Sequence, residues 1–101
     1  MKEVFIEKKC IVRTNRAGVF FGVVKEYDSE TRECLIANCR RLWYWDGACS
    51  LSQLAVEGSN RKSNCKFTVT VEQMVVMEVI EIIPCTKEAI KNIEEVAEWK
   101  K

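Results

Sequence analysis

The sequence predicts an α+β protein that is mainly β: a small antiparallel meander that curls into a partial barrel, with one short inserted helix and a C-terminal helix. Two observations lead to this prediction. Short apolar runs alternate with compact polar turns over the first half of the chain, which is the pattern of consecutive antiparallel strands. After Pro84, apolar residues recur at helical spacing, which indicates a closing helix.

The first half of the chain is expected to supply most of the meander. The turn sequences Asn-Arg-Ala-Gly and Asp-Ser-Glu-Thr divide it into strand-length pieces. Gly22 falls in the middle of one piece, which predicts a bulge, a sharp bend or the close approach of another backbone. The expected elements are an edge strand or arm at 1–9 and strands at 10–14, 19–27 and 32–45.

The second half is expected to contain both helices. Ser50 and Gln53 form a capping box that begins a short helix, and Gly58 is placed to end it in the left-handed conformation. Thr86 is a suitable N-cap for the closing helix. Between the helices we expect a polar segment at 59–64, either a solvated loop or a mobile flap, a strand at 66–71, and at 74–83 the most buried strand of the sheet.

Length and composition limit the function. The 101 residues fit a single ligand-binding domain, 1–101, with one core. The formal net charge of +1 argues against a long nucleic acid as partner. Histidine is absent, which removes the commonest general base and metal ligand. We therefore expect no enzyme, no catalytic residue, no metal and no cofactor.

The six cysteines indicate a cytoplasmic protein. We expect no signal peptide, because Met1 to Glu3 lead straight into a strand-like run, and no cysteine pair has the C-x-x-C spacing of a zinc ribbon. Several cysteines occupy apolar strand positions, where a reduced thiol acts as a small hydrophobic side chain. No apolar run approaches the roughly 20 residues of a membrane span, so we expect no membrane contact.

The stretch RRLWYWDGACSLSQLAVEG, residues 40–58, is the strongest candidate for a functional site. In an extended strand Arg40 and Tyr44 share one face, while Arg41, Trp43 and Trp45 share the other. Guanidinium groups, aromatic faces and a helix N-terminus together can hold a phosphate and stack a base. The same aromatic residues are also typical of the core and rim of a small barrel, and both interpretations stay open from the residues alone.

The segments VRTNRAGVFFG, RRLWYWDGACSLSQLAVEG, CKF and VIEIIPCTKEAIKNIEEVAEWK resemble a family of small, mostly uncharacterised proteins of tailed phages and prophages. The similarity runs from about Cys10 to Lys100, and RRxWYWxGAxSLxQLA is its specific signature. The family looks like one that provides anti-CBASS sponges, which bind and withhold the cyclic nucleotide signals of bacterial antiphage defence. The resemblance implies a symmetric homo-oligomer, a dimer or tetramer, with ligand pockets at subunit interfaces and no turnover.

A cyclic dinucleotide would offer two bases to stack and two phosphates to neutralise, and the residues of the central stretch suit both tasks. Alternatives are a protein-interaction module, a small nucleic-acid-binding barrel, and a hydrolase, for which the sequence offers no metal constellation. The candidate ligand-binding residues are Arg13, Arg40, Arg41, Trp43, Tyr44, Trp45, Gly47, Ser50, Ser52, Gln53 and Lys66.

Overall fold

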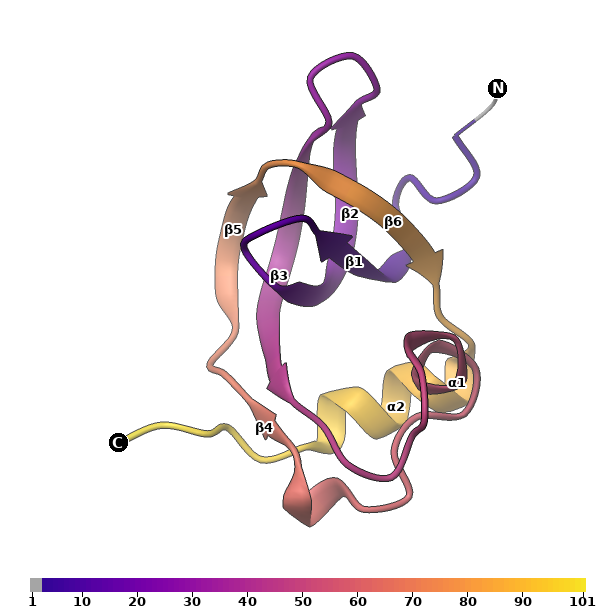
Figure 1. The fold of residues 1–101 in the computed structure, drawn as a ribbon, viewed down its shortest axis with the longest axis vertical. Coiled ribbons are helices and arrows are strands. Elements are labelled where there is room, and N and C mark those ends of the chain that lie inside the picture. Colours follow the sequence, from indigo (N-terminus) through magenta and orange to yellow (C-terminus); the bar gives the residue numbers. More distant parts are fainter. Residues whose placement is uncertain (1–2) are drawn as a thin grey trace.

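The computed structural model describes residues 3–101 and consists of a six-stranded antiparallel sheet with two α-helices (Figure 1). This confirms the predicted α+β, mainly β class. The sheet curls strongly without closing into a barrel. The elements are β1 Lys9–Thr14, β2 Val19–Asp28, β3 Glu33–Tyr44, α1 Leu51–Glu57, a 3₁₀ turn η1 Lys62–Asn64, β4 Lys66–Phe67, β5 Val71–Val76, β6 Val79–Pro84 and α2 Lys87–Glu95.

The curl of the sheet follows from its strand order. Strands β1, β2 and β3 form the expected meander, β6 adds to the free side of β1, and β5 adds to the far side of β3. Only Met77 and Glu78 join β5 to β6, so the two outer strands must end close together. Backbone hydrogen bonds hold this corner: Asn15 N donates to Glu78 O (2.9 Å) and Val79 N donates to Arg32 O (3.0 Å).

Gly22 and Asn38 together form the irregular point of the β2–β3 ladder. A Cβ on Gly22 would lie 2.5 Å from Ile36 Cγ2 and 2.8 Å from Ala37 O, which confirms the predicted close approach. Asn38 has a φ of 50°, and the register shifts at this position, as in a β-bulge. The extra residue reverses the alternation of β3, so Ile36 and Cys39 lie on the same side of the sheet.

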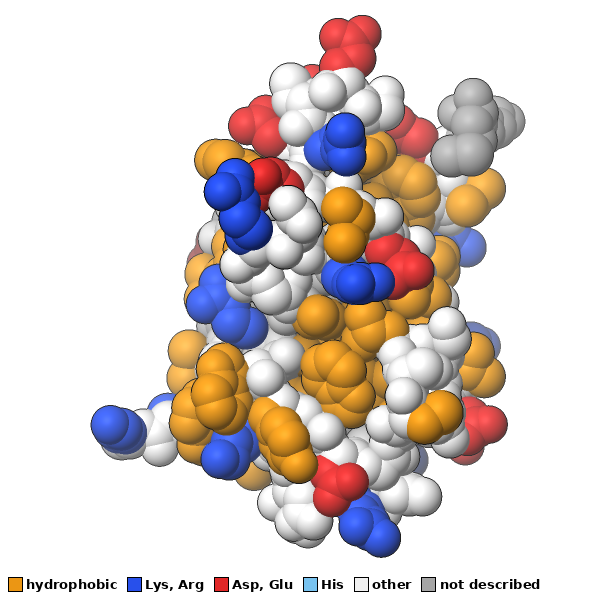
Figure 2. All heavy atoms as spheres, viewed as in Figure 1, with side chains coloured by type: hydrophobic (Ala, Val, Ile, Leu, Met, Phe, Trp, Pro, Cys, Tyr) orange, Lys and Arg blue, Asp and Glu red, His pale blue; other side chains and the backbone are white. Residues whose placement is uncertain are grey.

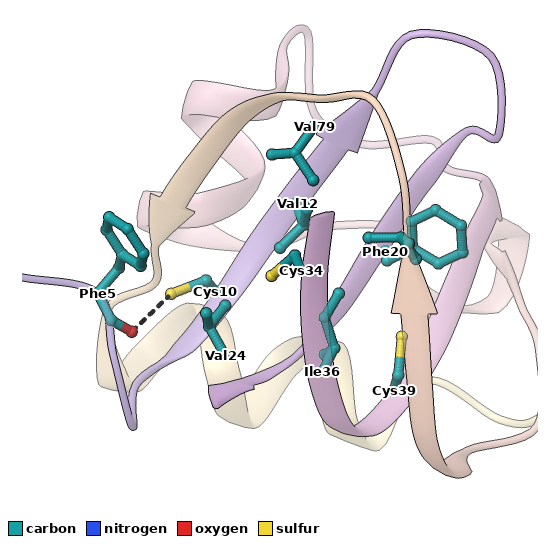
Figure 3. Packing of buried hydrophobic residues seen from close by; sticks show 10 residues of the cluster. Phe5, Cys10, Val12, Phe20, Val24, Cys34, Ile36, Cys39 and Val79 are labelled. Carbon is teal, nitrogen blue, oxygen red and sulfur yellow. Dashed lines mark hydrogen bonds between the residues drawn. The ribbon is translucent and has the colours of Figure 1, made fainter. Parts of the chain in front are cut away.

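The expected single core is divided by the sheet into two clusters. One fills the inside of the curl and includes Cys10, Phe20 and Ile36 (Figure 3). The other lies between the opposite face of the sheet and the helices and includes Phe67 and Leu54. The helices α1 and α2 cover this second cluster, which draws residues from β1, β2, β3, β4 and β6.

The helices begin where the sequence predicts. Ser50 Oγ accepts a hydrogen bond from Gln53 N (3.1 Å), and the Gln53 side chain accepts one from Cys49 N (2.7 Å), so the capping box forms. Thr86 Oγ1 caps α2 through Ala89 N (3.1 Å). Gly58 ends α1 with a positive φ of 76°, but its ψ of −166° lies outside the left-handed helical region.

Two strand predictions are wrong, and of the edge strand or arm expected at 1–9 the edge strand does not form in the described residues 3–8. The strand expected at 74–83 is two mostly exposed outer strands, β5 and β6, because Glu78 turns the chain with a φ of 58°. Residues 66–71 are not one strand, since β4 ends at Phe67 and β5 starts at Val71. Residues 4–7 form turns rather than an edge strand, although Phe5 is buried in the inner cluster. Met1 and Lys2, also part of that prediction, lie outside the described residues.

All six cysteines are free thiols in the structure, and four have raised pKa values because burial disfavours the thiolate. The pKa is about 12 for Cys10 and Cys39, and about 11 for Cys34 and Cys85. Cys65 is also buried, whereas Cys49 is exposed.

We predict that iodoacetamide at pH 8 modifies the native protein at Cys49 alone, because the thiolate is the reactive form and the other thiols are protonated or shielded. Intact-mass analysis should show one added group on the native protein and six after denaturation in urea. Rapid modification of several thiols in the native protein would contradict the packing of the two clusters.

Candidate functional site

An exposed group of aromatic side chains surrounds one ammonium at the end of β3. We call Trp43, Tyr44, Lys66 and Trp99 the aromatic patch. Lys66 Nζ lies 5.3 Å from the ring centroid of Trp43, 5.5 Å from that of Trp99 and 6.0 Å from that of Tyr44. The indoles of Trp43 and Trp99 stack with centroids 4.7 Å apart and planes inclined by 26°. Each distance is within the range of cation–π or aromatic attraction.

The aromatic patch remains open to solvent although its members contact one another. Trp43 is 56% exposed, Tyr44 48% and Trp99 43%. Exposure of this size for three large rings in one place is uncommon on a surface, and such patches mark binding sites. In Figure 2 the patch is the group of hydrophobic side chains around a basic one at the lower left, over β4 and the C-terminal segment.

Three segments far apart in the sequence build the aromatic patch. Trp43 and Tyr44 end β3, and Lys66 begins β4, which pairs with β3 at Tyr44. The segment after α2 runs beside β4: Glu98 bridges to Phe67, and Trp99 N donates to Phe67 O (2.8 Å). Nothing in the local sequence indicates that Trp99 meets Trp43, because the two residues lie on segments far apart in the chain.

Arg40 lies inside the protein and is not available to a ligand, which corrects its place among the candidate residues. The side chain is 4% exposed. Its Nε donates to Thr68 O (3.0 Å), its Nη2 to Phe67 O (3.1 Å), and its Nη1 to both Ile93 O (3.1 Å) and Val96 O (3.0 Å). Burial lowers the pKa of the guanidinium, and the Glu98 carboxylate acts in the opposite direction. Arg40 therefore joins the last turn of α2 to β4.

Asp46 and Gly47 shape the loop below the aromatic patch. Gly47 has a φ of 84°, and a Cβ there would lie 2.7 Å from Arg61 N. The Asp46 carboxylate accepts from Asn64 Nδ2 (3.2 Å) and from Gly47 N (2.8 Å), and these bonds hold its pKa below the usual range, with a smaller contribution from the Arg61 guanidinium. Gly47 thus has a structural role in this loop.

Ser59 continues this network toward α2. Its hydroxyl donates to Asp46 O and accepts from Arg61 N (2.9 Å), while the Asn92 amide bonds both Ser59 N (2.8 Å) and Ser59 O (2.6 Å). The basic residues of the segment are also paired, Arg61 with Asp46 (3.5 Å) and Lys62 with Glu95 (2.7 Å). For residues 59–64 these contacts favour the solvated loop over the mobile flap, because both basic side chains of the segment are already paired with carboxylates.

Some of the remaining candidate residues have structural roles, and others are exposed elsewhere on the surface. Trp45 packs against the outer cluster, and Ser50 and Gln53 are used in capping α1. Ser52 is exposed on α1, away from the patch-forming strands, and Arg13 faces Glu81 (3.8 Å). The structure therefore brings together Trp43, Tyr44 and Lys66 from the predicted set, and of the other candidates only Arg41 lies beside them.

Arg41 is exposed beside the aromatic patch, on the same side of β3 as Trp43. Its guanidinium lies 4.8 Å from the ring centroid of Phe20. Among residues 3–101 no carboxylate forms an ion pair with it.

An open depression of about 400 Å³ adjoins the other side of the patch, with Tyr44, Lys66, Trp99 and Asn64 in its walls. Cations and aromatic faces are thus next to accessible space.

Comparison with protein families gives one match. Residues 7–93 match DUF6948, described as a domain of unknown function. The chain belongs to this family. Its description names no ligand or partner, and a comparison with curated proteins finds no match.

Residues 3–101 contain no group of three or more acidic, cysteine or histidine side chains arranged to hold a metal ion. None of the helices in that range is both long enough and apolar enough to cross a membrane.

We predict that Arg40→Met lowers the free energy of unfolding by about 2–5 kcal/mol, because it leaves buried carbonyls without donors. Urea denaturation followed by circular dichroism measures the change. Arg41→Met is the matched control, since it removes the same group from an exposed position and should cost less than about 1 kcal/mol. Equal losses for the two variants would contradict the structural role of Arg40.

Proposed function

We propose that this protein binds a cyclic nucleotide at the aromatic patch and withholds it without cleaving it. The observation that carries the proposal is the placement of one ammonium within 5.3–6.0 Å of three exposed aromatic rings. Every type of nucleobase can stack on an aromatic face, and a nearby cation stabilises a bound phosphate. The patch supplies both from Lys66 and the rings around it, with Arg41 as a second cation.

The charge of the patch selects the type of ligand. Aromatic rings arranged around a cation commonly recognise quaternary ammonium groups. Here the protein's own Lys66 occupies that position, so a cationic ligand would meet repulsion. An anionic ligand with a planar ring gains the charge of Lys66 and a stacking surface together. A nucleotide has this combination of groups.

The biological setting of the proposal comes from the resemblance to small phage and prophage proteins. A sponge acts on a signal inside the infected or lysogenic bacterium, so we place this protein in the cytoplasm. It competes with an effector for the signal, which calls for a Kd of nanomolar or better, on the order of −12 kcal/mol. Retention of an intact nucleotide requires no general base, because no bond of the ligand is broken.

We also propose that the protein is a homo-oligomer, a dimer or a tetramer, in which a second copy covers the site. In one chain the patch is a surface with rings 43–56% exposed, whereas tight small-ligand sites bury about 70–90% of the ligand. A symmetric contact that places the same patch near a two-fold axis would enclose the ligand from both sides.

A second candidate function is a protein-interaction module. The observation that favours it is a set of exposed apolar residues on and beside β5 and β6, outside the aromatic patch: Val69, Val71, Val75, Met77 and Ile80. A host or phage protein could use them together with the tryptophans as a hot-spot surface. A nucleic-acid-binding barrel has less support because the net charge is only +1.

We predict that the protein retains at least one member of a panel of cyclic mono- and dinucleotides through gel filtration. After denaturation, chromatography of the supernatant should recover that nucleotide intact. Trp43→Ala should weaken binding by about 5- to 150-fold, since it removes the indole ring on which one base stacks. Lys66→Gln should weaken it through loss of the phosphate contact.

Two matched variants control this experiment. Ile80→Ala removes an exposed apolar side chain outside the aromatic patch, and Lys91→Gln removes an exposed charge on α2. Both should bind as the unaltered protein does. Retention of no nucleotide at all would exclude the proposal and leave the interaction module as the better candidate, whereas recovery of a broken nucleotide would indicate a hydrolase.

We predict that native mass spectrometry of the purified protein gives a dimer or tetramer whose mass includes bound nucleotide at a fixed ratio to the chains. The physical reason is that the patch of one chain is an open surface, whereas a tight small-ligand site encloses most of its ligand. A monomer at micromolar concentration, both with and without the retained nucleotide, would contradict the proposed assembly.

A further inference from the structure

A second hollow lies between the β1–β2 turn and β5, next to the corner where β5 meets β6. Its volume is about 410 Å³, and its walls are mainly apolar, with Phe20, Met74, Val75 and Met77 contributing. The turn between β1 and β2 forms one side and β5 forms the other (Figure 1). Figure 3 shows the Phe20 ring beside β5 at this end of the inner cluster. Concave, mainly apolar surfaces with a few polar groups at their edges are frequent ligand sites.

Arg41 connects this cavity to the aromatic patch. It lines the cavity, and Phe20 is its partner across the β2–β3 ladder. Trp43 follows Arg41 by two residues on the same side of β3, at a separation of about 7 Å. The order along this surface is therefore cavity, guanidinium, aromatic patch. The bulge at Asn38 produces it, because without the extra residue Arg41 would lie on the opposite side of the sheet.

The charges around the cavity make Arg41 the cation that a ligand would meet. Arg16 and Glu78 stand at the rim and bind each other through two hydrogen bonds of 3.0 and 2.8 Å. Their charges are thereby satisfied within the protein. Within residues 3–101 Arg41 has no such carboxylate partner, and its guanidinium rests on the Phe20 ring. An anionic group placed between cavity and patch would lie between Arg41 and Lys66.

We propose that the cavity is a second subsite and that the ligand carries two ring systems on either side of a negatively charged link, as a dinucleotide does. One base stacks on the aromatic patch, the phosphates lie at Arg41 and Lys66, and the second base enters the cavity. The sulfur atoms of Met74 and Met77 in its walls can make favourable contacts with an aromatic face. This inference rests on the proposed nucleotide binding at the patch and specifies which class of nucleotide is held.

The test compares 3′,3′-cyclic di-AMP, linear pApA and AMP by isothermal titration calorimetry. We expect both dinucleotides to bind about 5- to 150-fold more tightly than AMP, the factor that one additional stacked base supplies. Ala17→Trp should abolish this difference and leave AMP binding unchanged, because the indole fills the cavity from the exposed turn without altering a charge.

Asn15→Trp is the matched control. It places the same side chain in the same turn, at an exposed position that does not line the cavity, and should keep the preference for dinucleotides. Equal affinity of the unaltered protein for AMP and both dinucleotides would overturn the second subsite while leaving nucleotide binding at the patch intact. A preference that survives in Ala17→Trp would overturn it as well. Binding of none of the three probes at millimolar concentration would overturn the proposed function and this inference together.

Discussion

The buried guanidinium of Arg40 is the interaction on which the arrangement of the helical end depends. A cation removed from water is costly unless hydrogen bonds replace its hydration. Here four backbone carbonyls accept its N–H groups, two from β4 and the residue after it and two from the end of α2. Carbonyls at a helix C-terminus carry partial negative charge, which favours a cation by roughly 0.3–2 kcal/mol. One side chain thus fixes where α2 ends relative to the sheet.

The aromatic patch is a consequence of that attachment. Phe67 O accepts from both Arg40 Nη2 and Trp99 N, so the guanidinium that holds α2 shares an acceptor with the segment carrying Trp99. That segment then places one indole against Trp43 and beside Lys66. A buried arginine and an exposed arginine, adjacent in sequence, therefore serve different purposes: the first supports the surface on which the second, Arg41, stands next to a candidate ligand site.

The proposed function assigns a ligand to this surface on chemical grounds. Exposed rings alone would suit many partners, but the ammonium among them and the exposed guanidinium beside them favour an anion with planar groups. The apolar cavity on the far side of Arg41 extends the same surface. Membership of the DUF6948 family joins this chain to relatives in which the patch and the cavity can be compared.

The sequence by itself determined the elements whose signals are local. Capping residues Ser50 and Thr86 begin the helices, turn sequences separate the first three strands, and Gly22 marks a close backbone approach, because each depends on a few neighbouring residues. The tertiary structure decided the rest. The bulge at Asn38 sets which arginine is buried, and the meeting of Trp43 with Trp99 requires residues 56 positions apart. Periodicity cannot reveal a change of register or a contact between distant segments, since both arise only when the whole sheet and α2 have packed.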